Sequence, residues 1–395
     1  MVRRRVPAEA FGPTRRWASS AIALTVSVLV TLGAVAPAMG AYSSTTESSH
    51  QAIVTEAYEL SGWVASPHHP NWYWAHSDAW DSTDVYAACA DLSGTARSRC
   101  QQVQRARLWA FRIDPVTHAV LEARPFSVSD PAWATDPFVA QNNDWEDIAL
   151  GPPRPDGSGG TRVNLVVGAL GDAAGNPVYD ASGQDITCAT RRLIELREPD
   201  LGDPSATTWT PWRIYDLRNI VGTAGLSSCN VETLVVADGA DGDPTAFFVT
   251  KSLRKLFARS MDEATGRAPG TPPAPIDSDV AHRPAATYLG NVQGAKGIRF
   301  MAGTVNDDYV SLLSPRTPKH PCWILTWPRR AGGVGATLTQ DEPTKHDVTC
   351  TGQTEGLTYT HDPQDPSVST DDLLAVADNN SSSRSKFLYW FMPDR

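Results

Sequence analysis

Carboxylate side chains recur at the start of apolar segments in three separate parts of the sequence. The segments are NDWEDIAL, SCNVETLVV and TGQTEGLTY, and they align on Glu146, Glu232 and Glu355. Each of these glutamates is followed two residues later by Ile or Leu. Carboxylates that converge in a fold repel one another unless a cation, a proton or a ligand compensates them. The chemistry open to such a group is therefore cation binding or proton transfer.

Six acidic residues form a candidate metal site. Oxygen ligands alone suit Ca²⁺ or Mg²⁺ better than zinc, so Ca²⁺ is the predicted cofactor. Alternatively, these acids accept hydrogen bonds from backbone N–H groups and connect neighbouring repeats, since buried polar groups must be hydrogen-bonded. The residues alone leave both interpretations open. The predicted metal ligands are Asp78, Glu146, Asp147, Asp172, Glu232 and Glu355.

A histidine and a carboxylate lie close together in the segment WYWAHSD. His76 and Asp78 alternate along a predicted strand, which places both on one face. His76 and Glu146 are the predicted catalytic residues, because imidazole and carboxylate groups are common general acids and bases. A histidine beside aromatic residues is also typical of a packed, hydrogen-bonded core position, so a structural role for His76 is the alternative.

Two basic residues and one tryptophan complete the candidate site as substrate-binding residues. Lys251 in FVTKS and Arg299 in KGIRF would hold a phosphate or carboxylate group of a ligand beside the metal. Trp145, next to the first glutamate, offers an aromatic face on which a sugar could stack. The alternatives are ion pairs between the basic residues and the same acids, and packing of the tryptophan between repeats.

Short β-branched or aromatic runs separated by turn residues dominate the chain, which contains 30 Pro and 29 Gly. Each glutamate segment is followed by one apolar run (VNLVVGAL, TAFFVTKS or DLLAVAD) and then by another (RRLIELREP, RKLFARS or KFLYWF). Such a meander of roughly 40–50 residues is the size of a β-propeller blade. Sandwich domains would need linkers between two or three units, and no clear linker divides the sequence.

We therefore predict an all-β chain in which residues 41–395 form a single β-propeller of six blades, each a four-stranded antiparallel sheet. The innermost strand of every blade faces the central channel of a propeller. Equivalent positions in different blades consequently point toward one axis. The three glutamates, far apart in sequence, would meet at one mouth of that channel.

Several segments of the chain resemble one known family. The segments are SGWVASPHHPNWYWAHSDAWDSTDVYA, DWEDIALGP, LVVGALGDAAGN, IELREP, NVETLVV, FFVTKSL and TEGLTY. They are similar to exported bacterial β-propellers, common in actinobacteria, that are described as phytase-like, NHL-like or TolB-like. DWEDIA is the most specific motif, and the resemblance covers most of residues 60–390. It implies a propeller fold, and the chain departs from the family pattern at Ser77, Thr233 and residues 168–173.

Residues 1–40 have the pattern of a secretory signal peptide. Five arginines precede the apolar segment AIALTVSVLVTLGAV, and the small residues APAMGA follow it, with cleavage after Ala38 or Gly40. No later apolar run is long enough to cross a bilayer. We therefore expect a secreted, extracellular protein that is monomeric and has no membrane span after signal removal.

The mature chain is predicted to be acidic. The full sequence has 34 Lys and Arg and 44 Asp and Glu; removal of five Arg and one Glu with residues 1–40 leaves 29 and 43, a net charge of −14. An acidic surface repels phosphate backbones, so nucleic acid is excluded as a partner. The expected partner is a small molecule or glycan at the channel mouth.

Six cysteines are present, and an even count in an exported chain predicts three disulfides. Pairing of neighbours along the chain closes the shortest loops, which predicts the pairs 89–100, 188–229 and 322–350. Zinc binding is disfavoured, because there is no CxxC motif and no histidine at finger spacing. The cysteines are Cys89, Cys100, Cys188, Cys229, Cys322 and Cys350.

Two functions fit these patterns. In the first, a channel-bound Ca²⁺ polarises a phosphoester or similar anionic ester, and the protein is a metal-assisted hydrolase in which His76 or Glu146 transfers protons. In the second, the same mouth is a non-catalytic binding site for a carbohydrate, a peptide or an envelope partner. The fold alone does not choose between them.

Overall fold

The computed structural model describes most of the chain after residue 41. The predicted signal peptide lies outside the described residues and stays a prediction. The same holds for the predicted roles of five residues that are also outside them: Asp78, Asp172, Cys100, Cys188 and Cys229. The described ranges are 42–51, 60–77, 89–94, 96–97, 107–129, 145–170, 191–217, 231–268, 286–317, 321–350, 354–378 and 385–393.

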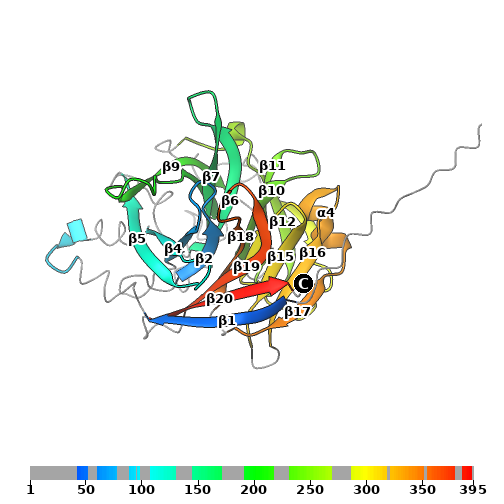
Figure 1. Cartoon of the computed structure of the whole chain (residues 1–395). Coiled ribbons are helices and arrows are strands. Elements are labelled where there is room, and N and C mark those ends of the chain that lie inside the picture. Colours follow the sequence, from blue (N-terminus) through cyan, green and yellow to red (C-terminus); the bar gives the residue numbers. More distant parts are fainter. Residues whose placement is uncertain are drawn as a thin grey trace, which may run out of the picture. The chain divides into compact units, whose positions relative to one another are not determined.

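Within these ranges, the strands build five antiparallel units of four strands, each arranged as a propeller blade (Figure 1). The first is β2 (Leu60–Ala65), β3 (Trp72–Ser77), β4 (Leu108–Ile113) and β5 (Val120–Val128), and the second is β6 (Trp145–Pro155), β7 (Thr161–Ala169), β8 (Arg192–Arg197) and β9 (Thr208–Asp216). The third is β10 (Val231–Asp238), β11 (Pro244–Thr250), β12 (Lys255–Ser260) and β13 (Thr287–Asn291). The fourth is β14 (Ala302–Val305), β15 (Tyr309–Ser314), β16 (Cys322–Pro328) and β17 (Thr344–Val348), and the fifth is β18 (Thr354–His361), β19 (Ser369–Asp378), β20 (Ser385–Pro393) and β1 (Tyr42–Gln51).

The innermost strands of the five units contact one another in a closed cycle. β2 contacts β6, β6 contacts β10, β10 contacts β14, β14 contacts β18, and β18 contacts β2. This is the arrangement of inner strands around the axis of a propeller. The all-β, propeller-like architecture predicted from the sequence is therefore present. A short parallel pairing of β5 with β9 also joins the outer edges of the first two blades.

The predicted number of six blades is not confirmed, because the cycle of described inner strands closes with five. The expected repeat length was too short: the inner strands β6, β10 and β14 begin at Trp145, Val231 and Ala302, so long segments separate them. In addition, β2 and β14 contain no acidic residue, and an alignment on glutamates does not reveal their blades.

The first strand of the chain completes the last blade. β1 pairs antiparallel with β20, from Tyr42 opposite Pro393 to Gln51 opposite Ser385 (Figure 1). The sequence of β1 is YSSTTESSHQ, which lacks apolar alternation and gives no strand signal. The pairing brings residues from both ends of the sequence into one sheet and covers an edge of β20 that would otherwise be open.

Apolar side chains fill the interfaces between neighbouring blades. Between the second and third blades, for example, Val166 and Leu193 belong to one buried cluster with Leu234 and Phe248. A strand that is buried on both faces reads as a continuous apolar run rather than as an alternating one. This burial explains why VNLVVGAL and TAFFVT are the clearest strand signals in the sequence.

Helical structure is limited to short segments. The helix α4 (Gly333–Gln340) lies between β16 and β17, and the 3-10 turn η2 (Glu263–Thr265) follows β12. No helix in the described part of the chain has the length and apolar character that a membrane crossing requires.

One predicted disulfide is described in full. Cys322 and Cys350 are bonded, their Cα atoms are 5.7 Å apart, and both side chains are buried. Cys89 also belongs to a disulfide. The predicted pair 322–350 is thus confirmed. The pairs 89–100 and 188–229 stay predictions, because each includes a cysteine outside the described ranges.

Candidate functional site

Each of the three aligned glutamates is the extra residue of a β-bulge on an inner strand. In β6 the pairing register passes from Trp145 to Asp147 and skips Glu146. The registers of β10 and β18 skip Glu232 and Glu355 in the same way. A bulge takes the extra residue out of the regular alternation of the strand and re-aims its side chain. The sequence alignment on these three positions is therefore structurally correct.

The ammonium group of Lys251 is a shared counter-ion for these glutamates. Lys251 follows β11, and its Nζ contacts Oε1 of Glu232. Burial lowers the pKa of Lys251, but the charge and hydrogen bond of Glu232, with the charges of Glu146 and Glu355, outweigh burial and raise it above its usual range. Three carboxylates from three blades thus act on one ammonium group. Lys251 and the three glutamates are called the carboxylate mouth below.

Lys251 and Glu355 are the accessible members of the carboxylate mouth. The side chain of Lys251 is 28% exposed, and Glu355 is partly buried. Glu146 and Glu232 are only 7% and 3% exposed. A ligand from solvent would consequently meet Lys251 and Glu355 first. Among these four described side chains, three are carboxylates and one is an ammonium group.

Asp147, a predicted metal ligand, instead connects three inner strands through hydrogen bonds. Oδ1 accepts from the backbone N–H of Ile148 at 2.9 Å, and Oδ2 accepts from those of Leu234 at 2.8 Å and Gly303 at 3.3 Å. The side chain has no exposed surface. Burial raises the pKa of Asp147 well above its usual range, although the three hydrogen bonds lower it. At this position the structure shows the hydrogen bonds of the alternative interpretation, a link between blades, and the metal-ligand role stays a prediction.

His76 and Trp145 are core residues rather than reachable site residues. Both are 0% exposed, and their rings meet edge to face with centroids 5.7 Å apart. Trp145 also packs edge to face against Trp209. Gly62 approaches the histidine so closely that a Cβ atom there would lie 2.8 Å from Nε2. The predicted catalytic role of His76 and stacking role of Trp145 stay predictions, and the complete burial of both side chains agrees with the alternative packing roles.

The backbone next to Arg299 is hydrogen-bonded to that of Lys251, but the Arg299 side chain forms no described ion pair with the three glutamates. The N–H of Phe300 donates to the carbonyl oxygen of Lys251 at 3.1 Å, and the side chain of Arg299 is exposed. Within the described part of the chain, the guanidinium forms no ion pair with the acids of the carboxylate mouth. Its predicted role as a ligand-binding residue stays a prediction.

The described residues include only four of the six predicted Ca²⁺ ligands, so the Ca²⁺ site stays a prediction. Among the described residues, no group of three or more His, Cys, Asp or Glu side chains is arranged to hold a metal ion. The carboxylate of Asp147 is bound to backbone N–H groups, and that of Glu232 contacts an ammonium group. The two remaining predicted ligands, Asp78 and Asp172, lie outside the described ranges.

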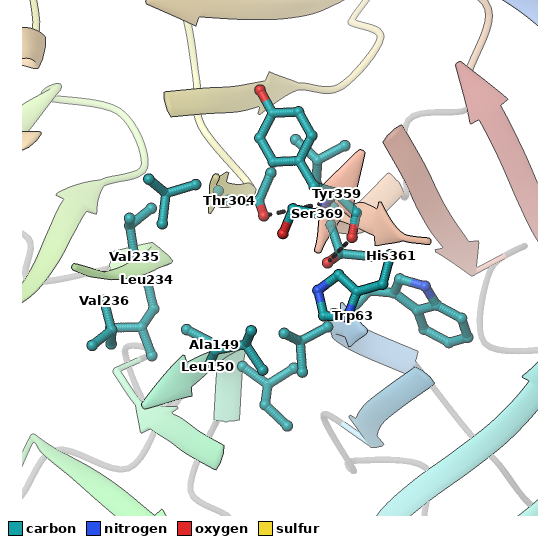
Figure 2. Close-up of a pocket in the computed structure, with 16 residues that line it drawn as sticks. Trp63, Ala149, Leu150, Leu234, Val235, Val236, Thr304, Tyr359, His361 and Ser369 are labelled. Carbon is teal, nitrogen blue, oxygen red and sulfur yellow. Dashed lines mark hydrogen bonds between the residues drawn. The ribbon is translucent and has the colours of Figure 1, made fainter. Parts of the chain in front are cut away.

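All five inner strands line a small pocket further along the axis, with a volume of about 40 Å³. Figure 2 shows Leu234 and Val236 on one side of this pocket, with Thr304, Ser369 and His361 across from them. The pocket therefore has an apolar side and a polar side. No charged residue lines it apart from the titratable imidazole. It is called the axial pocket below.

Glu198, just after β8, is a buried carboxylate to which sequence reasoning gave no role. Its Oε1 accepts hydrogen bonds from Oγ of Ser66 at 2.5 Å and from Nε1 of Trp74 at 2.7 Å. Nε2 of His68 lies 3.9 Å from Oε2. Burial raises the pKa of Glu198 to about 7, although both hydrogen bonds lower it. The segment IELREP resembles an ordinary strand end, so no local signal marks this glutamate.

Comparisons with known proteins give fold-level similarity only. No protein-family model matches the sequence, and no curated protein matches it. Among solved structures, an exo-β-1,3-galactanase from Clostridium thermocellum has a TM-score of 0.41 at 11% identity, over 86% of this chain and 59% of that one. An endo-arabinase from Bacteroides thetaiotaomicron has a TM-score of 0.39 at 11% identity, over 88% and 98%. The chain thus spans less than two thirds of the galactanase, and functional inference rests on the site geometry.

Proposed function

We propose that this protein is an exported β-propeller that binds a neutral, hydroxyl-rich ligand of the glycan class at the carboxylate mouth. The observation that carries the proposal is the group of three glutamates from three blades that acts on the single ammonium of Lys251. Carboxylates accept hydrogen bonds from hydroxyl groups, and an ammonium donates them. Hydrogen bonds to charged groups are about twice as strong as those between neutral groups.

The charge of the mouth favours a neutral ligand over an anionic ester. Ionised glutamates repel a phosphoester, which is the substrate of the metal-assisted hydrolase expected from the sequence. The ammonium of Lys251 is already engaged by Glu232 and would have to leave it to compensate a phosphate. Because the ammonium of Lys251 is engaged in this way, polyol binding is better supported by the mouth than binding of an anionic ester.

A second candidate function is hydrolysis of a glycosidic bond in the bound ligand. Most glycosidases need two carboxyl groups in different states, one ionised and one able to donate a proton. The mouth offers unequal environments: Glu232 contacts an ammonium group, whereas Glu355 is partly exposed. We assign Glu232 as the ionised member and Glu355 as the member that reaches the ligand.

Calorimetric titration of the protein without residues 1–40 tests the binding proposal. The ligands are neutral oligosaccharides, their uronic-acid counterparts and a generic phosphoester. We expect saturable binding of a neutral oligosaccharide that weakens by about tenfold in Glu355→Gln, because one charge-assisted hydrogen bond is lost. Release of reducing ends from the same oligosaccharides tests hydrolysis.

A matched control separates the mouth from general surface charge. Glu122 lies on the outer strand β5, where it pairs with Arg112 at 3.5 Å, and Glu122→Gln should leave the affinity unchanged. Binding should also persist in the presence of a chelator. Preference for the phosphoester, or loss of all binding on chelation, would contradict the proposal and support the metal-dependent hydrolase instead.

A further inference from the structure

The axial pocket shares no lining residue with the carboxylate mouth. We propose that it is a second ligand site, which takes a small neutral alcohol whose hydroxyl group donates a hydrogen bond to Nε2 of His361. Residues from all five inner strands line the pocket, and none of the side chains in this proposal belongs to the carboxylate mouth.

The hydrogen bonding of His361 sets which ring nitrogen can accept. Nδ1 of His361 lies 3.2 Å from the carbonyl oxygen of Ser66. A carbonyl oxygen only accepts, so Nδ1 carries the proton and Nε2 keeps its lone pair. Burial lowers the pKa of His361, which favours the neutral ring at pH 7. Among the described residues nothing is hydrogen-bonded to Nε2, so the pocket offers one fixed acceptor.

The residue that holds His361 is itself held in place. Oγ of Ser66 accepts from the backbone N–H of His69 at 2.9 Å and donates to the buried carboxylate of Glu198 at 2.5 Å. Ser66 is 1% exposed. The carbonyl group that orients the imidazole therefore belongs to a rigid turn, and the acceptor is pre-organised for a ligand.

The size and lining of the pocket define the rest of the ligand. A cavity needs about 10–15 Å³ for each water-sized occupant, so about 40 Å³ holds a group of roughly three to four non-hydrogen atoms. Leu150, Leu234 and Val236 cover its apolar side, and the hydroxyl of Ser369 lies on the polar side (Figure 2). A short aliphatic alcohol matches this size, one apolar face and one donor.

Asp147, next to Glu146 in β6, is hydrogen-bonded to the lining of the pocket. Two residues that line the pocket, Leu234 and Gly303, donate their backbone N–H groups to its carboxylate. The carboxylate is completely buried, and neither Lys251 nor any of the three glutamates lines the pocket. Failure of the alcohol site would leave the proposed glycan site untouched.

Two probes of nearly equal shape test the proposal. 2-Propanol can donate a hydrogen bond, whereas acetone only accepts. Each is titrated into isotopically labelled protein, and the methyl chemical shifts of Leu150, Leu234 and Val236 are followed. We expect saturable shifts in the millimolar range for 2-propanol and about five- to tenfold weaker binding of acetone, because Nε2 of His361 cannot pair with a second acceptor. The methyl groups of Val116, which is 85% exposed, serve as the internal reference.

Variants assign the discrimination to the imidazole. His361→Leu should remove the difference between the two probes, and Ser369→Ala should preserve it, since the hydroxyl is not the acceptor. If His361→Leu fails to fold, the ¹⁵N shift of Nε2 in the unchanged protein gives the same information, because accepting a hydrogen bond moves it. Equal affinity for both probes, or shifts of Val116 as large as those in the pocket, would overturn the proposal.

Discussion

Lys251 and Glu232 form an ion pair at the inner edge of the third blade, with the ammonium in contact with the carboxylate and only 4% of the glutamate side chain exposed. The same ammonium lies in the field of Glu146 and Glu355 from two other blades. A side chain of the protein thus supplies the positive charge that converging carboxylates require. At least part of the charge compensation therefore comes from the protein itself.

Loss of the ammonium should destabilise the protein most at neutral pH. Lys251→Met removes an ammonium group that interacts with three glutamates, and we expect a loss of about 2 kcal/mol in unfolding free energy at pH 7. The raised pKa of Lys251 means that its contribution is complete below the ordinary pKa of lysine and is lost only in strong alkali. Urea unfolding at pH 7 and pH 4.5 measures the effect, which should shrink in acid as carboxylates are protonated.

The exposed residue Lys296 provides the control for this change. Lys296→Met should alter stability by less than about 0.5 kcal/mol. Adding Glu232→Gln to Lys251→Met should restore part of the loss, because it removes one of the repelling charges. Equal destabilisation by both lysine variants would contradict a counter-ion role for Lys251.

Asp147 should be among the least replaceable side chains of the chain. Asp147→Ala leaves three buried backbone N–H groups without their acceptor, and Asp147→Asn turns an amide N–H₂ toward a donor. We expect losses of about 3 kcal/mol or more for the alanine variant in urea unfolding. Asp307→Asn, at an exposed position, is the matched control and should be neutral. A small loss of unfolding free energy in both Asp147→Ala and Asp147→Asn would show that the hydrogen bonds to Asp147 contribute little.

Glu198 should make stability fall as pH rises through the weakly acidic range. Its folded pKa of about 7 exceeds the ordinary value of 4.5, so the native state binds more protons than the unfolded state between these values. Unfolding free energy should therefore decline by about 3 kcal/mol from pH 4.5 to pH 7 through this group, and level off above. Glu198→Gln should lack that decline when unfolding curves are measured across the range, while Glu122→Gln should run parallel to the unchanged protein.

The disulfide Cys322–Cys350 should contribute about 3–4 kcal/mol through its effect on the unfolded chain. It closes a loop with a sequence separation of 28, and the chain-entropy relation gives this magnitude for such a loop. The double variant Cys322→Ala with Cys350→Ala should lose it in thermal or urea unfolding, with the ligand sites intact. An unchanged midpoint would show that the fourth blade is held by packing alone.

Position in the repeat was predictable from the sequence, whereas side-chain environment was not. The alignment of Glu146, Glu232 and Glu355 came from a strand pattern that packing enforces, and the three share one place on the inner strands. The burial of Trp145 and the hydrogen bonds that Asp147 accepts depend on a bulge of one residue in β6. A shift of one residue reverses which face a side chain occupies, and letters alone do not locate it.

Long-range pairing accounts for the other differences. The polar segment that forms β1 gains its strand conformation only by pairing with β20, hundreds of residues away. Lys251 gains its role from three glutamates on separate blades, and Glu198 gains its burial from Ser66 and Trp74 of the first blade. Tertiary contacts of this kind leave no local pattern, because neither partner needs an unusual neighbour in sequence.

The pairing of β1 with β20 also bears on where the predicted signal peptide would be cleaved. The predicted cleavage points after Ala38 and Gly40 leave the strand that begins at Tyr42 whole. Removal of a few more residues would take away backbone hydrogen bonds between β1 and β20. The edge of β20 would then be open to pairing with other chains. If the predicted signal peptide is removed, cleavage before Tyr42 would therefore keep the edge of β20 covered.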